Sequence, residues 1–230
     1  MLSATKGEIM SIDHERRALF GLVAATLASA SIGAPDADAA QSQSKNAVKE
    51  TPLARIPLQT PQSMPELFEF LEQRRPGAAK TTIFPALANC PEILRAFIEM
   101  ADRVREGNGI DPKLREMAIV MTCQTIGTRY EQSRHWNSAL QSGVPKAKLE
   151  KLWDYEDSDM FSPLEKAVLR LARNASRAPA QVSETDWDDV RSVLGDQKAL
   201  ALLFSIGWYN MTGRLTGTLD MKDEPGFVRL

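Results

Sequence analysis

Proline and glycine divide this chain, from about Pro65 onward, into a series of short amphipathic segments. Pro65, Pro91 and Pro112 each stand at the start of a run whose apolar residues recur every three or four positions. Proline is favoured in the first turn of a helix, and this recurrence is the period of a helix with one buried face. No run shows the strict alternation of apolar and polar residues that predicts a half-buried strand. The pattern therefore predicts an all-α domain of six to eight helices.

The expected helices start near residues 65, 91, 112, 128, 146, 163, 184 and 197, and the last one extends to about residue 219. Asp111 is expected to cap the helix that begins at Pro112, because its carboxylate accepts a bond from a free backbone N–H. Thr128 and Glu131 have the spacing of a capping box, in which each side chain bonds to the backbone N–H of the other residue. Gly143 is expected to end the helix that follows.

The N-terminal segment has the character of an export signal. Arg16 and Arg17 precede a mildly apolar run at 18–28 that is too short to span a membrane, and residues 37–39 offer a small-residue cleavage site. Paired arginines before such a run resemble a twin-arginine signal, although the flank fits that pattern only in part, and Met10 is an alternative start. A disordered, alanine-rich tail is the other interpretation.

These features predict three parts and an exported, periplasmic protein. Residues 1–39 are interpreted as the signal peptide, residues 40–62 as a polar linker and residues 63–230 as one helical domain. The net charge of −2, without a basic stripe, gives no sign of a nucleic-acid partner. No later run is apolar for long enough to cross a membrane, so no stable membrane insertion is expected.

The two cysteines, Cys90 and Cys123, match neither a zinc site nor a Cys-x-x-Cys redox motif. They either form one disulfide in an oxidising compartment or remain free, as buried cysteines in helical cores often do. The sequence predicts no cofactor and no metal ion.

His135 is the one histidine that follows the predicted export signal. Histidine is the side chain whose charge ordinarily changes between about pH 5 and 8, so it suits proton transfer near neutral pH. Glu131 lies four residues earlier, on the same helix face, and Glu116 lies nineteen residues earlier, on the preceding expected helix. Antiparallel or sharply angled packing of these two helices would bring all three side chains together.

Each of these residues also has a structural interpretation. Glu131 completes the capping box with Thr128, Glu116 stabilises the positive end of a helix dipole, or His135 is a hydrogen-bonded core histidine. A metal site made of the three is a further alternative, although three such side chains are a thin ligand set.

These residues resemble the carboxymuconolactone decarboxylase and alkylhydroperoxidase D-like superfamily. The resemblance lies in an acid that opens an apolar helix and a histidine about nineteen residues later. It covers most of the chain from about residue 65, and the motifs that carry it are Arg115-Glu116-Met117-Ala118-Ile119, Tyr130-Glu131 with His135, Gly143-Val144-Pro145 and residues 203–215. The resemblance implies a multi-helix, alkylhydroperoxidase D-like bundle that acts on a small molecule and assembles as a homo-oligomer, a trimer or a hexamer.

One departure from the family pattern is informative. Thr128 and Glu131 stand where the peroxidase branch has its two cysteines. Thiol peroxidase chemistry needs an attacking thiolate and a resolving thiol, and neither is present there. The chain therefore resembles the cysteine-less, decarboxylase-like branch.

The leading hypothesis is a carboxy-lyase-like enzyme that acts by acid–base chemistry on a small carboxylated or lactone organic acid. His135 is assigned as the proton shuttle, Glu131 as the group that orients it and Glu116 as a second acid–base group. The substrate-binding candidates are Arg214 for a carboxylate and Tyr209 and Tyr130 for a carbonyl oxygen, although an interface charge and core aromatics are the plainer interpretations. The alternatives are a thiol-dependent peroxidase and a non-catalytic, ligand-binding oligomer of the same fold.

Overall fold

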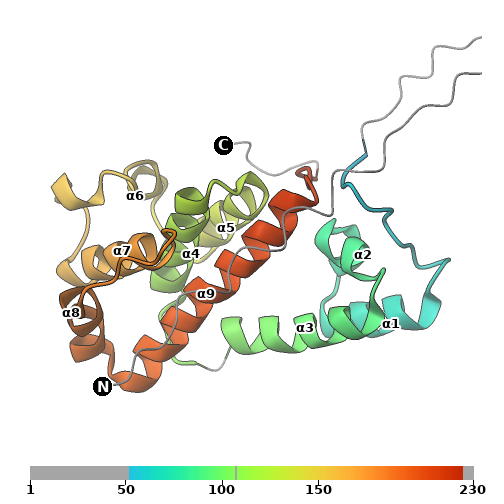
Figure 1. The fold of residues 1–230 in the computed structure, drawn as a ribbon, viewed down its shortest axis with the longest axis horizontal. Helices are drawn as coiled ribbons and strands as arrows, with labels where there is room; N and C mark the ends of the chain where they lie inside the picture. The colour runs from blue at the N-terminus through green and yellow to red at the C-terminus, as the bar shows by residue number, and fades with distance from the viewer. Residues whose placement is uncertain (1–51, 107, 225–230) are drawn as a thin grey trace, which may run out of the picture. The chain divides into compact units, whose positions relative to one another are not determined.

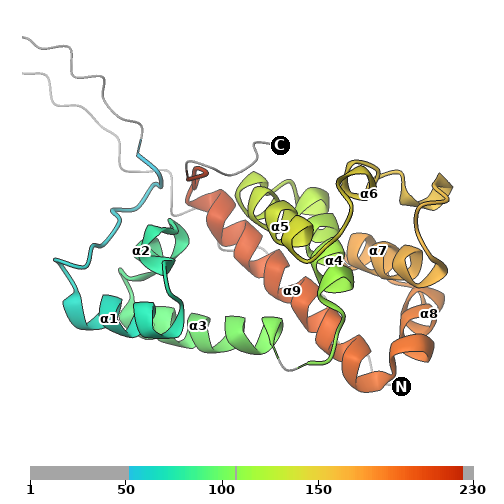
Figure 2. The same ribbon diagram turned by 180° about the vertical axis from the view of Figure 1, so that it is seen from behind.

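The computed structural model describes residues 52–106 and 108–224, which form α-helices and two short 3₁₀-helices without a strand (Figures 1 and 2). The all-α prediction is confirmed for this part of the chain. The helices are α1 (Pro65–Arg74), η1 (Ala78–Lys80), α2 (Ile83–Leu87), α3 (Pro91–Arg105), α4 (Pro112–Ile126), α5 (Arg129–Gln141), α6 (Lys146–Glu150), η2 (Tyr155–Asp157), α7 (Pro163–Ala175), α8 (Glu184–Leu194) and α9 (Asp196–Thr218).

The predicted helix starts agree closely with the structure. Proline occupies the first turn of α1, α3 and α4, and the Asp111 side chain accepts a 2.9 Å bond from the Lys113 backbone N–H. The described residues contain nine α-helices, one more than the upper end of the prediction. The helix that the prediction omitted is α2, a five-residue helix with Pro85 at its centre and every residue buried. A segment of this length contains too few residues to show a helical period.

The predicted capping box at Thr128 is wrong. Thr128 does precede α5, but its side chain makes no capping bond, and its Oγ1 lies 3.4 Å from Oγ1 of Thr216 on α9. Glu131, which would have completed the box, is instead turned into the interior and is only 4% exposed. The capping box does not form because the side chains of Thr128 and Glu131 pack against other parts of the fold, and a local sequence motif does not determine such packing.

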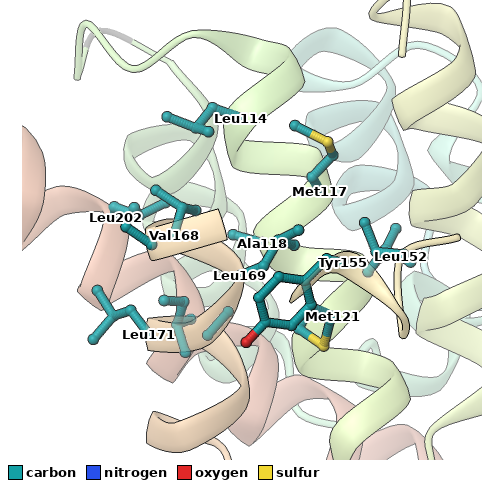
Figure 3. Close-up of a cluster of buried hydrophobic side chains, with 14 of the residues drawn as sticks. Leu114, Met117, Ala118, Met121, Leu152, Tyr155, Val168, Leu169, Leu171 and Leu202 are labelled. Atoms are coloured by element: carbon teal, nitrogen blue, oxygen red, sulfur yellow. The ribbon is translucent and has the colours of Figure 1, made fainter. Parts of the chain in front are cut away.

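Helix α9 is the central element of the domain (Figures 1 and 2). It packs against α4, α5, α7 and α8 on one side and against α3 on the other. Figure 3 shows the core between α4 and α7, where α4 places Leu114, Met117, Ala118 and Met121 against Leu169 and its neighbours. Because α4 is buried from residue 114 to residue 123, polar side chains on it are held in a water-poor interior.

A second hydrophobic cluster joins α1, η1, α2 and α3 to Tyr130 of α5 and Met221 after α9. The described end of the predicted linker lies along this part of the domain. The backbone N–H of Arg55 bonds to the Leu219 carbonyl at 2.7 Å, and that of Lys222 bonds to the Leu53 carbonyl at 2.9 Å. The predicted signal peptide and the first part of the predicted linker lie outside the described residues.

None of the helices within residues 52–106 and 108–224 combines the length and the apolar character needed to cross a bilayer.

Candidate active site

A glycine turn brings α5 back against α4. Gly127 ends α4 with a φ of 72°, in the left-handed region that glycine adopts without steric cost. The Thr128 N–H bonds to the Cys123 carbonyl at 3.0 Å, which closes the turn, and α5 begins at the next residue. The two helices pack directly against each other. The turn therefore produces the helix pairing that the sequence permitted.

Glu116 of α4 and His135 of α5 form a buried hydrogen-bonded pair. Oε2 of Glu116 lies 2.7 Å from Nδ1 of His135, and the two side chains are 2% and 6% exposed. Burial acts to raise the pKa of Glu116, but the charge and hydrogen bond of His135, aided by Arg105 and Arg115, outweigh it and hold that pKa below its ordinary value. An ionised carboxylate only accepts hydrogen bonds, so Nδ1 of His135 is the donor and Nε2 is left for other partners.

Glu131 lies on the other side of the same imidazole. Its Oε2 is 3.8 Å from Nε2 of His135, and its Oε1 has no hydrogen-bond partner among the described residues. Burial raises the pKa of Glu131, although His135 and Arg134 oppose this in part, so Glu131 holds its proton more readily than an exposed glutamate does. The structure thus brings all three predicted residues together. It pushes the pKa values of the two carboxyl groups in opposite directions, a pattern that separates an acid from a base.

His135 and Glu131 line a pocket of about 390 Å³. The pocket lies between α5 and α9 on one side and α1, α2 and α3 on the other. The Tyr209 ring packs edge-on against His135, with centroids 4.3 Å apart and an interplanar angle of 71°, and it lines the same pocket. Glu116 is not part of the lining, so it reaches the pocket only through His135.

Four arginines line the pocket, and the sequence pointed to none of them. Arg74 and Arg75 both bond to Asp102, at 2.6 and 2.7 Å, and Arg134 pairs with Glu224. Arg105, the last residue of α3, also lines the pocket. In a sequence, a basic residue in the last turn of a helix is already explained by the helix dipole, so it gives no functional signal.

The other predicted substrate-binding residues lie elsewhere. Tyr130 is buried beside the pocket without lining it, and its hydroxyl donates to Oε1 of Glu224 at 2.9 Å and accepts from the Ile83 N–H at 3.3 Å. Arg214 is exposed, bonds to the carbonyl and side-chain oxygens of Asn210, and lines a different pocket with Ser176. The structure therefore does not place Arg214 with His135.

Both cysteines are free. Cys90 is exposed, whereas Cys123 is fully buried and packs with Tyr209. Burial, reinforced by the charges of Glu131 and Glu116, raises the pKa of the Cys123 thiol well above its ordinary value. In the part of the chain that the structure describes, no group of three histidine, cysteine or acidic side chains has the arrangement of a metal site.

Comparison with solved structures defines the fold. The apo structure of the debrominase Bmp8 superposes with a TM-score of 0.63 at 19% identity, covering 76% of this chain and 93% of that one. An uncharacterized peroxidase-related protein from Ralstonia eutropha JMP134, described as an alkylhydroperoxidase AhpD core, gives the same TM-score and identity and covers 76% and 94%. One from Silicibacter sp. TM1040 gives a TM-score of 0.60 at 23% identity and covers 77% and 92%. The fold is that of alkylhydroperoxidase D-like proteins.

A family model matches part of the sequence. Residues 91–174 match the model described as the Carboxymuconolactone decarboxylase family, and this segment contains Glu116, Glu131 and His135. This match and the alkylhydroperoxidase D-like fold are consistent with the carboxymuconolactone decarboxylase and alkylhydroperoxidase D-like superfamily, which the sequence resembles. A comparison with curated protein sequences returned no match.

Proposed function

We propose that this protein is an acid–base enzyme that acts on a small organic acid, of the carboxylated or lactone type, bound in the pocket beside His135. The observation that carries the proposal is the contact of one imidazole with two buried carboxyl groups whose pKa values are shifted in opposite directions. Perturbed groups in a cleft are characteristic of functional sites. The debrominase neighbour was also crystallised with 2,3,4-tribromopyrrole, so this fold takes small ring compounds in at least one protein.

The geometry favours an exchange of the roles predicted for the two glutamates. Glu116 holds Nδ1 of His135 and fixes the tautomer, which is the task of a positioning residue. Glu131 lines the pocket and has a raised pKa, so it is the better placed of the two to act as a general acid. His135 presents Nε2 to the same space and transfers protons between Glu131 and the substrate.

For a decarboxylation, the reaction begins with loss of the substrate carboxylate. The bond between the substrate carbon and its carboxylate breaks, carbon dioxide leaves, and the electron pair passes into a conjugated carbonyl to form a dienolate. Glu131 or protonated His135 then delivers a proton to carbon, and solvent restores the lost proton. Such general acid–base assistance contributes typically about 10²–10⁴-fold to the rate.

The thiol-dependent alternative receives little support from the structure. Cys123 does not line the pocket, and its raised pKa disfavours the reactive thiolate. Cys90 is exposed and lies outside the pocket lining. Thr128 and Glu131 provide no thiol at the peroxidase positions.

The test is turnover of a panel of lactone and β-keto carboxylic acids, followed by carbon dioxide release and by deuterium incorporation into the product in heavy water. His135→Gln should lower turnover about 10²-fold or more, because glutamine hydrogen-bonds but does not titrate. In the full chain, with residues 1–39 retained, His14→Gln makes the same change at the other histidine and should leave turnover at the parent level. Equal turnover by parent and His135→Gln, with the fold intact, would contradict the proposal.

The homo-oligomer remains part of the proposal. Leu200, Phe204 and Met211 lie along α9, are 61%, 51% and 44% exposed and line one apolar groove, and contiguous exposed apolar surface is characteristic of interaction sites. Sedimentation velocity of the parent and of Phe204→Ser should show a trimer or hexamer that is weakened by the substitution. A monomeric parent would contradict this part of the proposal.

A further inference from the structure

The cationic side chain of Arg105 has no hydrogen-bond or ion-pair partner among the described residues. It is half-buried at the pocket wall. The backbone at this position is fixed, because the Arg105 carbonyl accepts a 2.6 Å bond from Nη1 of Arg115. Nη2 of Arg115 in turn lies 3.5 Å from Oε1 of Glu116, so Arg115 links the end of α3 to the residue that bonds to the imidazole of His135.

The other three arginines of the pocket each bond to an acidic side chain. Asp102 bonds to both Arg74 and Arg75, and Glu224 pairs with Arg134. Of the remaining acids in the lining, Glu106 is exposed, and Glu131 lies against His135, with burial raising its pKa. Arg105 is therefore the arginine of the lining that has no acidic side chain bonded to it among the described residues.

The Arg105 charge also acts on the catalytic groups. It contributes to lowering the pKa of Glu116, and it opposes the burial that raises the pKa values of Glu131 and Tyr209. Coulomb interactions of this kind weaken rapidly with distance and with exposure to water. Arg105 therefore lies within electrostatic reach of the groups on which the proposed chemistry depends.

We propose that Arg105 is the residue that binds the carboxylate of the substrate and selects acids over their neutral analogues in this pocket. A planar guanidinium matches a carboxylate by two parallel hydrogen bonds and keeps its charge at any ordinary pH. The Oε1 atom of Glu131, which is buried and has no described partner, provides a second polar contact for the same ligand. This inference rests on the proposed function and assigns to Arg105 the task that the sequence had suggested for Arg214.

The test measures binding and not turnover, so that it is independent of the chemical step. Benzoate and fumarate are titrated calorimetrically against the full chain, each beside its neutral amide, benzamide and fumaramide. Three variants are compared with the parent: Arg105→Gln, Arg105→Lys and Arg103→Gln. Arg103 is the matched control, because it is an exposed arginine on the same helix turn that does not line this pocket.

The parent should bind at least one carboxylate more tightly than its amide. Arg105→Gln should weaken that carboxylate on the order of 10–100-fold, the value of a charge-assisted contact, and leave the amide unchanged. Arg105→Lys should recover part of the affinity because it keeps the charge without the planar fork. Arg103→Gln should bind like the parent.

Two results would overturn the assignment: carboxylates that bind the parent no better than their amides, or an Arg105→Gln protein, with a parent-like circular dichroism spectrum, that binds carboxylates as the parent does. Failure of the proposed function looks different, since His135→Gln would then leave turnover unchanged while the Arg105-dependent binding persisted.

Discussion

Replacing Glu116 by glutamine tests the energetic coupling within the site. The substitution keeps the size of the side chain but removes the charge that accepts the Nδ1 hydrogen bond of His135. The bond is 2.7 Å long and both side chains are almost fully buried, so little water is available to replace the lost interaction. Hydrogen bonds to charged groups contribute about 1.5–3 kcal/mol.

A domain of this size loses about 2–4 °C of melting temperature for each kcal/mol, so Glu116→Gln should lower Tm by about 3–12 °C near pH 7. The matched control is Glu150→Gln, which removes the same charge from an ion pair with Lys146. The Glu150 side chain in that pair is 54% exposed. Exposed pairs of this kind contribute about 0–1 kcal/mol, and the control should melt close to the parent.

The pH dependence gives an independent readout. Because the pKa of Glu116 is lower in the folded protein than its ordinary value of 4.5, its contribution is complete above that pH and is lost as pH falls through the folded value. The difference in stability between parent and variant should therefore shrink on acidification from about pH 7 to below about pH 4. Glu131 is present in both proteins, so its own titration is common to them.

Thermal unfolding followed by circular dichroism at several pH values is the assay. A Glu116→Gln protein that melts with the parent at neutral pH, or a stability difference that grows on acidification, would refute the reasoning.

Three further predictions concern the scaffold. Gly213→Ala should destabilise the protein by about 1–3 kcal/mol in urea unfolding, because a Cβ there would lie 2.7 Å from the side chains of Ile126 and Thr128 at the α4–α5 junction. Gly207→Ala is the control: it lies in open space on the same helix and should be neutral or stabilising by up to about 1 kcal/mol. A thiol reagent should label Cys90 rapidly and Cys123 only on unfolding, as peptide mass spectrometry would show, and equal labelling in the native state would contradict the burial. Asp111→Ala should cost about 1 kcal/mol through loss of the α4 cap, and an unchanged urea midpoint would contradict this.

The helix boundaries were predictable because their signals are local. A proline in the first turn, an aspartate cap and a left-handed glycine each act within a few residues of the chain, as Pro112, Asp111 and Gly127 do at the two ends of α4. The proximity of Glu116 and His135 was permitted by the sequence, because a single break separates their helices, but the sequence did not require it. The capping box at Thr128 was wrongly predicted, because tertiary contacts compete with local ones for the same side chains.

The residues that α3 contributes to the pocket could not be predicted from the sequence. Arg105 approaches His135 only through the packing of α3 and α9, which no short spacing encodes. The assignment of Arg214 to the same site as Tyr209 conflicts with helix geometry alone. Residues five apart on one helix point about 140° away from each other, so one of them faces the pocket while the other faces away.

The most direct test of the central claim is the tautomer of His135, read by nitrogen-15 NMR of the imidazole and assigned by comparison with His135→Gln. At a pH where the ring is neutral, the account predicts a proton on Nδ1, shared with Glu116, and a bare Nε2 facing the pocket. A proton on Nε2 with a bare Nδ1 would contradict it, because Glu116 would then be the protonated partner and would no longer orient a base toward the substrate.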